Sequence, residues 1–178
     1  MKLIRLTPLF LMLIPIKFYA LELDSKSAFF NSLSALCGET FEGEMTFPTQ
    51  GQDSFAGKVL VAKIDACSET EIRVPFHVGL DKSRTWIISK TEQGLQLKHD
   101  HRYENNTPHK INMYGGVSDS GGSALSQSFY ADDHTKSIIP AASTNVWSIT
   151  LNQQGTTLIY YLERHNAPRF KAVLKRRK

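Results

Sequence analysis

The sequence predicts an all-β protein, an antiparallel up-and-down meander of about ten strands that closes into a barrel and follows one short helix. After Gly38, apolar and polar residues alternate with a period of two, the pattern of strands that bury one face. Short turns, for example at 92–94 and 152–155, separate these segments and favour antiparallel pairing of sequence neighbours. A sandwich is the alternative arrangement, but closure into a barrel removes the exposed sheet edges.

A helix is expected over residues 25–36, before the strands begin. Its apolar residues recur at the spacing of one helix face: Phe29, Phe30, Leu33 and Leu36. Gly38 follows and is typical of a helix end, because glycine adopts the left-handed conformation that terminates a helix at little steric cost. The helix is therefore expected to be short and amphipathic.

Ten segments show the strand pattern: 41–47, 59–66, 70–78, 84–90, 94–103, 110–115, 124–130, 145–151, 157–164 and 169–174. The alternation is clear at 70–78, where Ile72 and Val74 fall on one face. The longest irregular segments are expected at 48–58 and 131–144. The second is interpreted either as a lid over a barrel mouth or as a plain surface loop.

Residues 1–20 have the order of a cleaved signal peptide: basic residues at Lys2 and Arg5, an apolar run at 6–16, and a terminal alanine. The apolar run is about half the roughly 20 residues that a membrane-spanning helix needs, so no integral membrane segment is expected after cleavage. The remaining residues, 21–178, are expected to form a single barrel-like domain. These features predict a periplasmic or secreted protein.

The net charge of +4 does not indicate a nucleic-acid partner. Three of the 21 basic residues precede residue 21 and six follow residue 168, which leaves 12 basic against 17 acidic residues and a net charge of −5 between them. The body of the chain is therefore mildly acidic. The basic tail at 175–178 is interpreted as a solvated terminus, with a contact to anionic lipid or polymer as the alternative.

Cys37 and Cys67 are the two cysteines of the chain, and an even number in an exported protein predicts a disulfide between them. The bond would close a loop of about 30 residues and contribute about 3 kcal/mol to stability. The pair lacks the Cys-x-x-Cys spacing of redox sites, so a structural role is favoured.

The segment 95–103 carries the most informative polar residues. One strand face is expected to hold Leu95, Leu97, His99, His101 and Tyr103. A slip of one residue would bury three charged side chains in their place, which costs far more than burying neutral imidazoles. Both histidines are therefore predicted to point into the barrel.

Three interpretations of the histidine pair stay open. Inward imidazoles of His99 and His101 can bind a ligand, water or other interior polar groups, or lie half-exposed near a barrel mouth. The spacing i, i+2 also suits two ligands of one metal ion or a haem, although no third ligand is evident in the sequence. No cofactor is therefore predicted, and a metal or haem is the alternative.

Two resemblances are carried by short motifs. Residues 36–44, at the end of the helix and the start of the first strand, resemble the opening of lipocalin and fatty-acid-binding (calycin) barrels, with Phe41 in place of a tryptophan. Longer stretches resemble an uncharacterised family of secreted bacterial proteins, over most of the chain after the signal peptide: 73–79, 84–86, 98–102 and 113–116. The first resemblance implies a lipocalin-like barrel and the second implies export from a bacterial cell; neither implies an activity.

The leading functional hypothesis is a non-catalytic envelope protein that binds a small amphipathic ligand inside the barrel. The candidate ligand-binding residues are His99, His101, Tyr103, Trp86 and Tyr160, and no catalytic residue is predicted. One alternative is a metal- or haem-binding protein or enzyme that uses the two histidines. The other is an envelope factor that binds or inhibits a protein through its loops, with an unknown partner.

Overall fold

A computed structural model describes residues 24–47 and 55–178. The predicted signal peptide at 1–20 and most of the segment expected to be irregular at 48–58 lie outside these residues. Eleven β-strands form one antiparallel sheet, in which most strands pair with their neighbours along the chain. Their bounds are β1 Thr40–Phe47, β2 Leu60–Lys63, β3 Ala66–Cys67, β4 Glu71–Val78, β5 Asp81–Thr91, β6 Gly94–His101, β7 Tyr114–Ser118, β8 Ser126–Ala131, β9 Val146–Leu151, β10 Thr157–Arg164 and β11 Ala167–Arg176.

The sheet closes because β4 pairs with both β2 and β3. These two short strands are successive parts of one interrupted segment, and the resulting barrel has 10 strands around its axis. The closing register joins Leu60 to Val78 and Ala62 to Phe76. The predicted all-β barrel is therefore confirmed, with the meander order that the short turns indicated.

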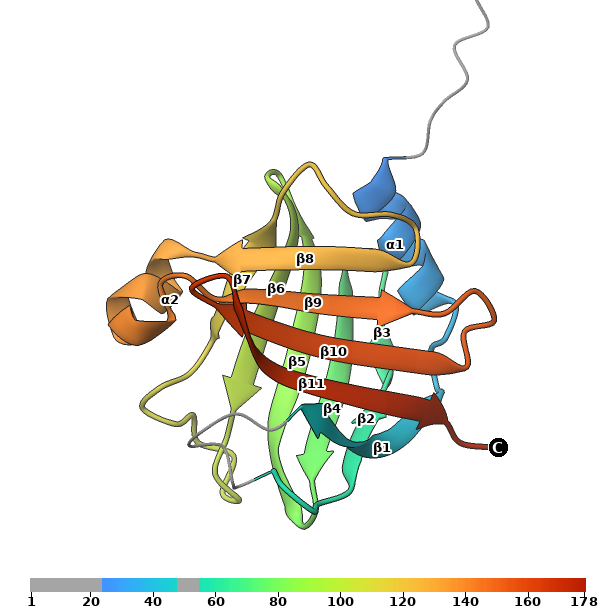
Figure 1. Ribbon diagram of the computed structural model, residues 1–178, viewed down its shortest axis with the longest axis horizontal. Coiled ribbons are helices and arrows are strands. Elements are labelled where there is room, and N and C mark those ends of the chain that lie inside the picture. Colours follow the sequence, from blue (N-terminus) through green and yellow to red (C-terminus); the bar gives the residue numbers. More distant parts are fainter. Residues whose placement is uncertain (1–23, 48–54) are drawn as a thin grey trace, which may run out of the picture.

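Helix α1, Ser25–Ser34, lies across one end of the barrel (Figure 1). Phe29, Phe30 and Leu33 are buried on its inner face, as their spacing predicted. They join a core made of the inward side chains of the strands, including Ile72, Ile88 and Leu158 near the same end. The half of the barrel beneath α1 is thus filled by apolar side chains.

Three of the expected elements differ in the structure. The segment 131–144 is not irregular: it contains α2, Asp133–Ile138, and the 3₁₀-helix η1, Pro140–Ala142. Asp132 caps α2, its carboxylate accepting a hydrogen bond of 2.9 Å from the backbone N–H of Thr135. The expected strand 94–103 ends at His101, and the one expected at 110–115 begins only at Tyr114.

Two glycines let β7 lie close to the strands on both of its sides. A Cβ atom on Gly115 would lie 1.9 Å from the carbonyl oxygen of Leu97, and one on Gly116 would lie 2.3 Å from that of Tyr130. Glycine is a poor strand residue by propensity, but here it permits both neighbouring strands to approach β7. The pattern of alternating side chains could not show this requirement.

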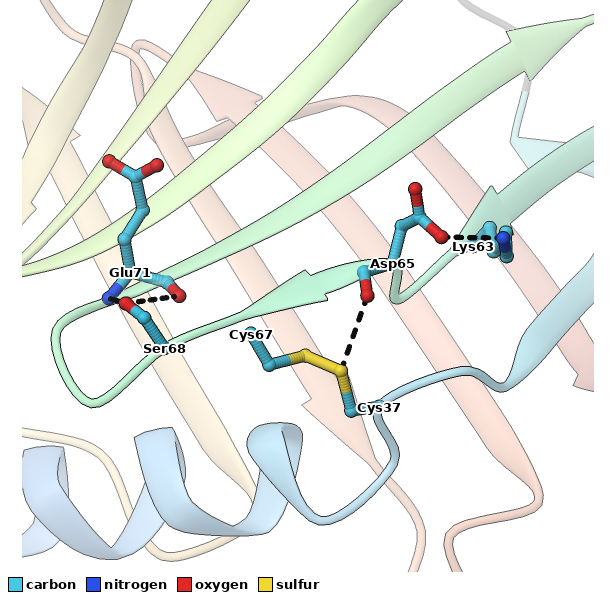
Figure 2. The surroundings of a disulfide bond; sticks show 6 residues. All are labelled: Cys37, Lys63, Asp65, Cys67, Ser68 and Glu71. Carbon is cyan, nitrogen blue, oxygen red and sulfur yellow. Dashed lines mark hydrogen bonds and ion pairs between the residues drawn. A yellow bond between two sulfur atoms is a disulfide. The ribbon is translucent and has the colours of Figure 1, made fainter.

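The disulfide joins Cys37, just after α1, to Cys67 on β3, with Cα atoms 6.3 Å apart (Figure 2). The predicted disulfide therefore links the segment that follows α1 to the barrel wall. Within residues 24–47 and 55–178, no helix has the length and apolar character needed to cross a bilayer.

Loss of the disulfide is expected to lower the free energy of unfolding by about 2 to 4 kcal/mol, because the unfolded chain gains the freedom of a 30-residue loop. Chemical denaturation of oxidised protein, of reduced protein and of Cys67→Ser measures this change. Circular dichroism should show the same strand content in all three. Two free thiols in unreduced, denatured protein would refute the bond.

Gly115→Ala is expected to destabilise the fold by about 3 kcal/mol, because the added methyl group must push β6 away from β7. Gly121→Ala is the control, since its Cβ would meet mainly the exposed side chain of Asp119, and its expected effect is below about 0.5 kcal/mol. Urea denaturation of both variants makes the comparison. Equal effects would contradict the proposed steric role of Gly115.

Candidate ligand cavity

A cavity of about 400 Å³ occupies the half of the barrel away from α1. Its lining includes Ile139 and Ala142, which directly follow α2, and α2 lies at the opposite side of the barrel from α1 (Figure 1). Its aromatic wall is formed by Phe55, Phe76, Trp86, Tyr114, Trp147, Tyr160 and Phe170. The helix thus plugs one end of the barrel while the other end holds space for a small molecule.

Strand alternation explains how polar residues reach this cavity. On β5, Arg84 shares the inward face of Trp86, and on β10, Arg164 shares that of Tyr160 and Leu162. On β6, His99 and His101 continue the inward row of the leucines, as predicted. Each row is apolar near α1 and becomes polar toward the open end.

His99 is held by two hydrogen bonds deep in the cavity. Its Nδ1 lies 3.1 Å from the carbonyl oxygen of Tyr114, and its Nε2 lies 2.7 Å from the hydroxyl of Tyr160. A carbonyl oxygen only accepts, so Nδ1 carries the proton, Nε2 is the acceptor, and the Tyr160 hydroxyl donates to it. Burial lowers the pKa of His99 to about 3, which keeps the imidazole neutral at pH 7.

Tyr114 connects the two histidines. Its ring stacks on that of His99 with centroids 4.7 Å apart, and its hydroxyl lies 3.0 Å from Nε2 of His101. Burial, followed by the positive charge of Arg84, lowers the pKa of His101 to about 4. Burial raises the pKa of Tyr114 to about 12 and that of Tyr160 above its ordinary value. The two histidines and two tyrosines are therefore uncharged at pH 7.

Trp86 forms the centre of an aromatic stack on one side of the cavity. The centroid of its ring lies 4.4 Å from the ring centroid of Phe76 and 4.4 Å from that of Tyr160, and both pairs are stacked. The same Tyr160 donates to His99, so the stack and the hydrogen-bonded pair support one another. This wall offers rigid, flat surfaces to a ligand.

Two arginines supply charge at the open end. Arg84 forms an ion pair with Asp81, and its guanidinium lies 5.4 Å above the ring of Phe55. Arg164 donates from Nε to the side-chain oxygen of Asn145 at 2.7 Å. Burial and the neighbouring Arg169 lower the pKa of Arg164. Among the described residues that line the cavity there is no Asp or Glu.

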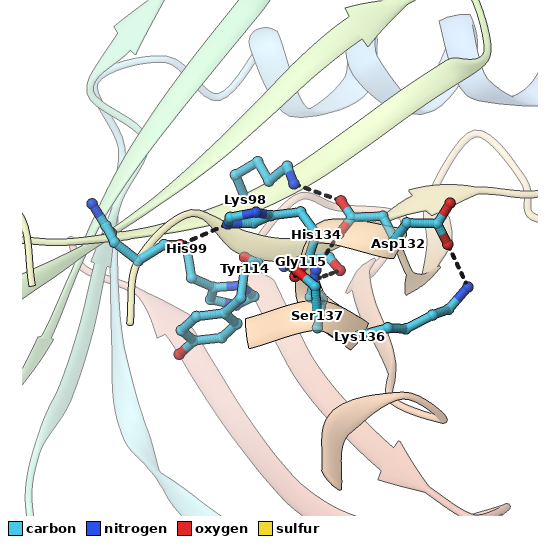
Figure 3. Close-up of polar contacts among 11 residues, drawn as sticks. Lys98, His99, Tyr114, Gly115, Asp132, His134, Lys136 and Ser137 are labelled. Atoms are coloured by element: carbon cyan, nitrogen blue, oxygen red, sulfur yellow. Dashed lines mark hydrogen bonds and ion pairs between the residues drawn. The ribbon is translucent and has the colours of Figure 1, made fainter. Parts of the chain in front are cut away.

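The segment 131–144 forms part of the cavity wall through Ile139 and Ala142. It is attached to the barrel by an ion pair between Lys98 and Asp132, with 2.5 Å between Nζ and Oδ2 (Figure 3). Thr135 adds a second attachment, its hydroxyl bonding to both the backbone N–H and the carbonyl of Gly115. The segment expected as a lid or a surface loop is thus a packed helix beside the mouth.

Four of the five predicted ligand-binding residues line this one cavity: Trp86, His99, His101 and Tyr160. The fifth, Tyr103, does not line it. Tyr103 is 55% exposed and packs on His109, with ring centroids 4.0 Å apart. It lies beyond the end of β6, so the alternation that predicted its inward direction no longer applies.

Asp100 also differs from its expected environment. The inward prediction for His99 and His101 places Asp100 on the outer, polar face of β6, where solvent exposure is expected, but Asp100 is buried. Its carboxylate accepts hydrogen bonds from Arg102 at 2.8 Å and from Asn112 at 3.1 Å. The residues that follow β6 fold back over this face, and the neighbouring Arg102 and Asn112 hold the pKa of Asp100 below its usual value against the opposing effect of burial.

The sequence reasoning missed Arg84 and Arg164 as cavity residues. The signal was present, because each lies an even number of residues from an aromatic residue predicted to point inward: two from Trp86 and four from Tyr160. Charged residues at strand ends are ordinarily solvated, so the pattern alone did not favour an inward direction.

A metal site on the histidine pair gains no support from this geometry. Both ring nitrogens of His99 already have hydrogen-bond partners, and a metal ion would displace one of them. In the part of the chain that the structure describes, no group of three or more His, Cys, Asp or Glu residues has the arrangement of a metal centre. The hydrogen-bonded interpretation of the inward histidines therefore fits best.

Comparisons with protein-family models, with curated proteins and with solved structures find no match to this chain. The cavity is therefore interpreted from its own residues and their geometry.

Stability is expected to fall between pH 7 and pH 5, and His99 should contribute about 2 kcal/mol of this loss. The pKa of a histidine in the unfolded chain is about 6.5, whereas that of folded His99 is about 3. Between these values the unfolded chain binds more protons, so unfolding becomes more favourable as the pH falls. Urea denaturation at both pH values measures the slope.

The variant His99→Gln should flatten this pH dependence, because glutamine does not titrate. His165→Asn at an exposed position is the matched control, since asparagine tolerates the positive φ of 54° found there, and its slope should stay steeper than that of His99→Gln. His101 contributes to the slope in all three proteins. An unchanged slope in His99→Gln would contradict the neutral, buried state of this imidazole.

Proposed function

We propose that this protein is exported to the bacterial envelope, where it binds a small amphipathic molecule inside its barrel without catalysing a reaction. The observation that carries the proposal is the cavity, which joins an aromatic wall to a polar rim at the end of the barrel away from α1. Such mixed, concave and largely preformed sites are typical of small-molecule binding.

The dimensions and the wall support a ligand of modest size. A volume of about 400 Å³ falls within the range of roughly 300 to 1,000 Å³ found for small-molecule sites. Trp86 and Tyr160 offer apolar faces, while His101 and Arg164 offer hydrogen-bonding groups on the same lining. A molecule with one apolar and one polar end matches this division.

The hydrogen bonds of His99 favour binding over acid–base catalysis. A general acid or base works best when its pKa lies near the operating pH, whereas the pKa of His99 is lowered to about 3. Its two nitrogens are engaged with Tyr114 and Tyr160. His99 therefore serves to fix the direction of the Tyr160 hydroxyl and the shape of the wall.

Export is supported by the disulfide between Cys37 and Cys67, because such bonds persist mainly in oxidising compartments. The predicted signal peptide at 1–20 points to the same compartment. Periplasm and external medium both satisfy this condition, and the proposal covers either.

The neutral fluorescent probe N-phenyl-1-naphthylamine is expected to bind one molecule per chain, and the variant Ile139→Trp should weaken its binding about tenfold. Ile139 lines the cavity from the segment after α2, so a larger side chain there occupies the space for the probe. Fluorescence titration gives the affinity and the stoichiometry.

The matched control is Ile138→Trp, which makes the same change on the neighbouring residue outside the cavity lining. Its affinity for the probe should equal that of the wild type. Absence of saturable probe binding, or equal effects of the two tryptophan variants, would overturn the assignment of the cavity as the binding site.

A further inference from the structure

The sign of the charge at the cavity mouth restricts the ligand. Four titratable residues of the lining are neutral at pH 7, because burial moves the pKa of each away from neutrality: His99, His101, Tyr114 and Tyr160. The described part of the lining contains two arginines and no carboxylate. A cationic head group would therefore meet only like charge, whereas an anion would meet complementary charge.

Of the two arginines that line the cavity, Arg164 is the one whose positive charge has no carboxylate partner among the described residues. Arg84 already has a carboxylate partner in Asp81. In contrast, neither Arg164 nor Arg169 takes part in an ion pair among the residues that the structure describes. The guanidinium of Arg169 lies close enough to that of Arg164 for its charge to lower the pKa of Arg164, after the larger effect of burial.

The orientation of Arg164 suits an oxyanion. Its Nε is fixed by the 2.7 Å hydrogen bond to Asn145, a residue whose own side chain is only 4% exposed. This bond leaves the terminal nitrogens of a planar guanidinium, the groups that form paired hydrogen bonds with carboxylate, sulfonate or phosphate oxygens. The neighbouring Arg169 does not line the cavity, but its Nε is buried with no hydrogen-bond partner in the described chain, so one unsatisfied donor and a second positive charge lie near Arg164.

The aromatic wall selects the apolar part of the ligand. Trp86, Tyr160 and Phe76 form a continuous stack, and Trp147 and Tyr114 face the cavity from other strands. A flat ring system covers flat walls more completely than a flexible chain does, and it loses less conformational freedom when it binds.

We propose that the ligand is a planar aromatic or conjugated organic anion, with its oxyanion at Arg164 and its ring system against the stack of Phe76, Trp86 and Tyr160. This inference rests on the proposed function, because it names the ligand class for the same cavity. Arg84 lies at the same mouth and adds a second, partly neutralised positive charge.

Two probes separate the contribution of charge from that of the ring. Both 8-anilinonaphthalene-1-sulfonate and N-phenyl-1-naphthylamine carry the same aromatic system, and only the first carries a sulfonate. Arg164→Gln should weaken binding of the sulfonate about tenfold more than binding of the neutral probe, the loss expected when a charged hydrogen bond is removed. Arg164→Lys, which keeps the charge but loses the planar fork, should give a smaller loss of selectivity.

Lys82→Gln is the control for general charge, because Lys82 is exposed on β5 near the same end of the barrel and does not line the cavity. It should change neither affinity by more than about twofold, a difference small against the tenfold effect expected at a direct contact. Added salt should weaken binding of the sulfonate probe more than binding of the neutral probe. Fluorescence titration of each variant with each probe, with a thermal melt to confirm folding, provides these values.

The outcomes distinguish this inference from the proposed function. If the neutral probe binds and Ile139→Trp weakens it, but Arg164→Gln affects the two probes equally or affects neither, the anion assignment is wrong and the binding function stands. If Lys82→Gln lowers sulfonate affinity as much as Arg164→Gln, surface charge rather than the cavity attracts the anion, and the assignment also fails. If neither probe binds saturably, the proposed function itself fails.

Discussion

The pairing of β4 with β2 is the contact on which the rest of the structure depends. Without it the sheet would end in two free edges, at β2 and at β3, and the inward rows would not surround a common axis. With it, strands that are remote in sequence face one another across the interior. The bond between His99 and Tyr160, which are 61 residues apart, exists only because closure brings β6 opposite β10.

Closure leaves an interior that the side chains use in two different ways. Beneath α1 most of the inward residues are aliphatic or aromatic, with the buried Gln127 of β8 as an exception, and Phe29, Phe30 and Leu33 complete their packing. Away from α1 the same strand rows become polar, and the imidazoles of His99 and His101 have hydrogen-bond partners in Tyr160 and Tyr114, which offsets the cost of burying them. The division follows from where the polar residues fall along each strand rather than from any change in backbone structure.

The alternation of apolar and polar residues along the strands predicted which side chains of the cavity point inward, because that direction depends on local strand structure. It gave the correct inward direction for Trp86, His99, His101 and Tyr160, because each lies within a regular strand, His101 as the last residue of β6. It was wrong for Tyr103, because the end of β6 is set by the packing of the following residues over Asp100. Helix α2 and the placement of β7 also depend on contacts remote in sequence, those of Asp132 with Lys98 and of Gly115 with Leu97.

Charge at the mouth depends on which carboxylates are already paired. Asp81 forms an ion pair with Arg84, and Asp100 forms one with Arg102. Neither of these two carboxylates lines the cavity. Asp132 is engaged by Lys98 on the outer face, where it holds α2 against the barrel. These pairs neutralise the acidic residues nearest the mouth without placing any of them inside it. Since burial keeps His99, His101 and Tyr114 neutral, the unpaired positive charge at the cavity rests mainly on Arg164.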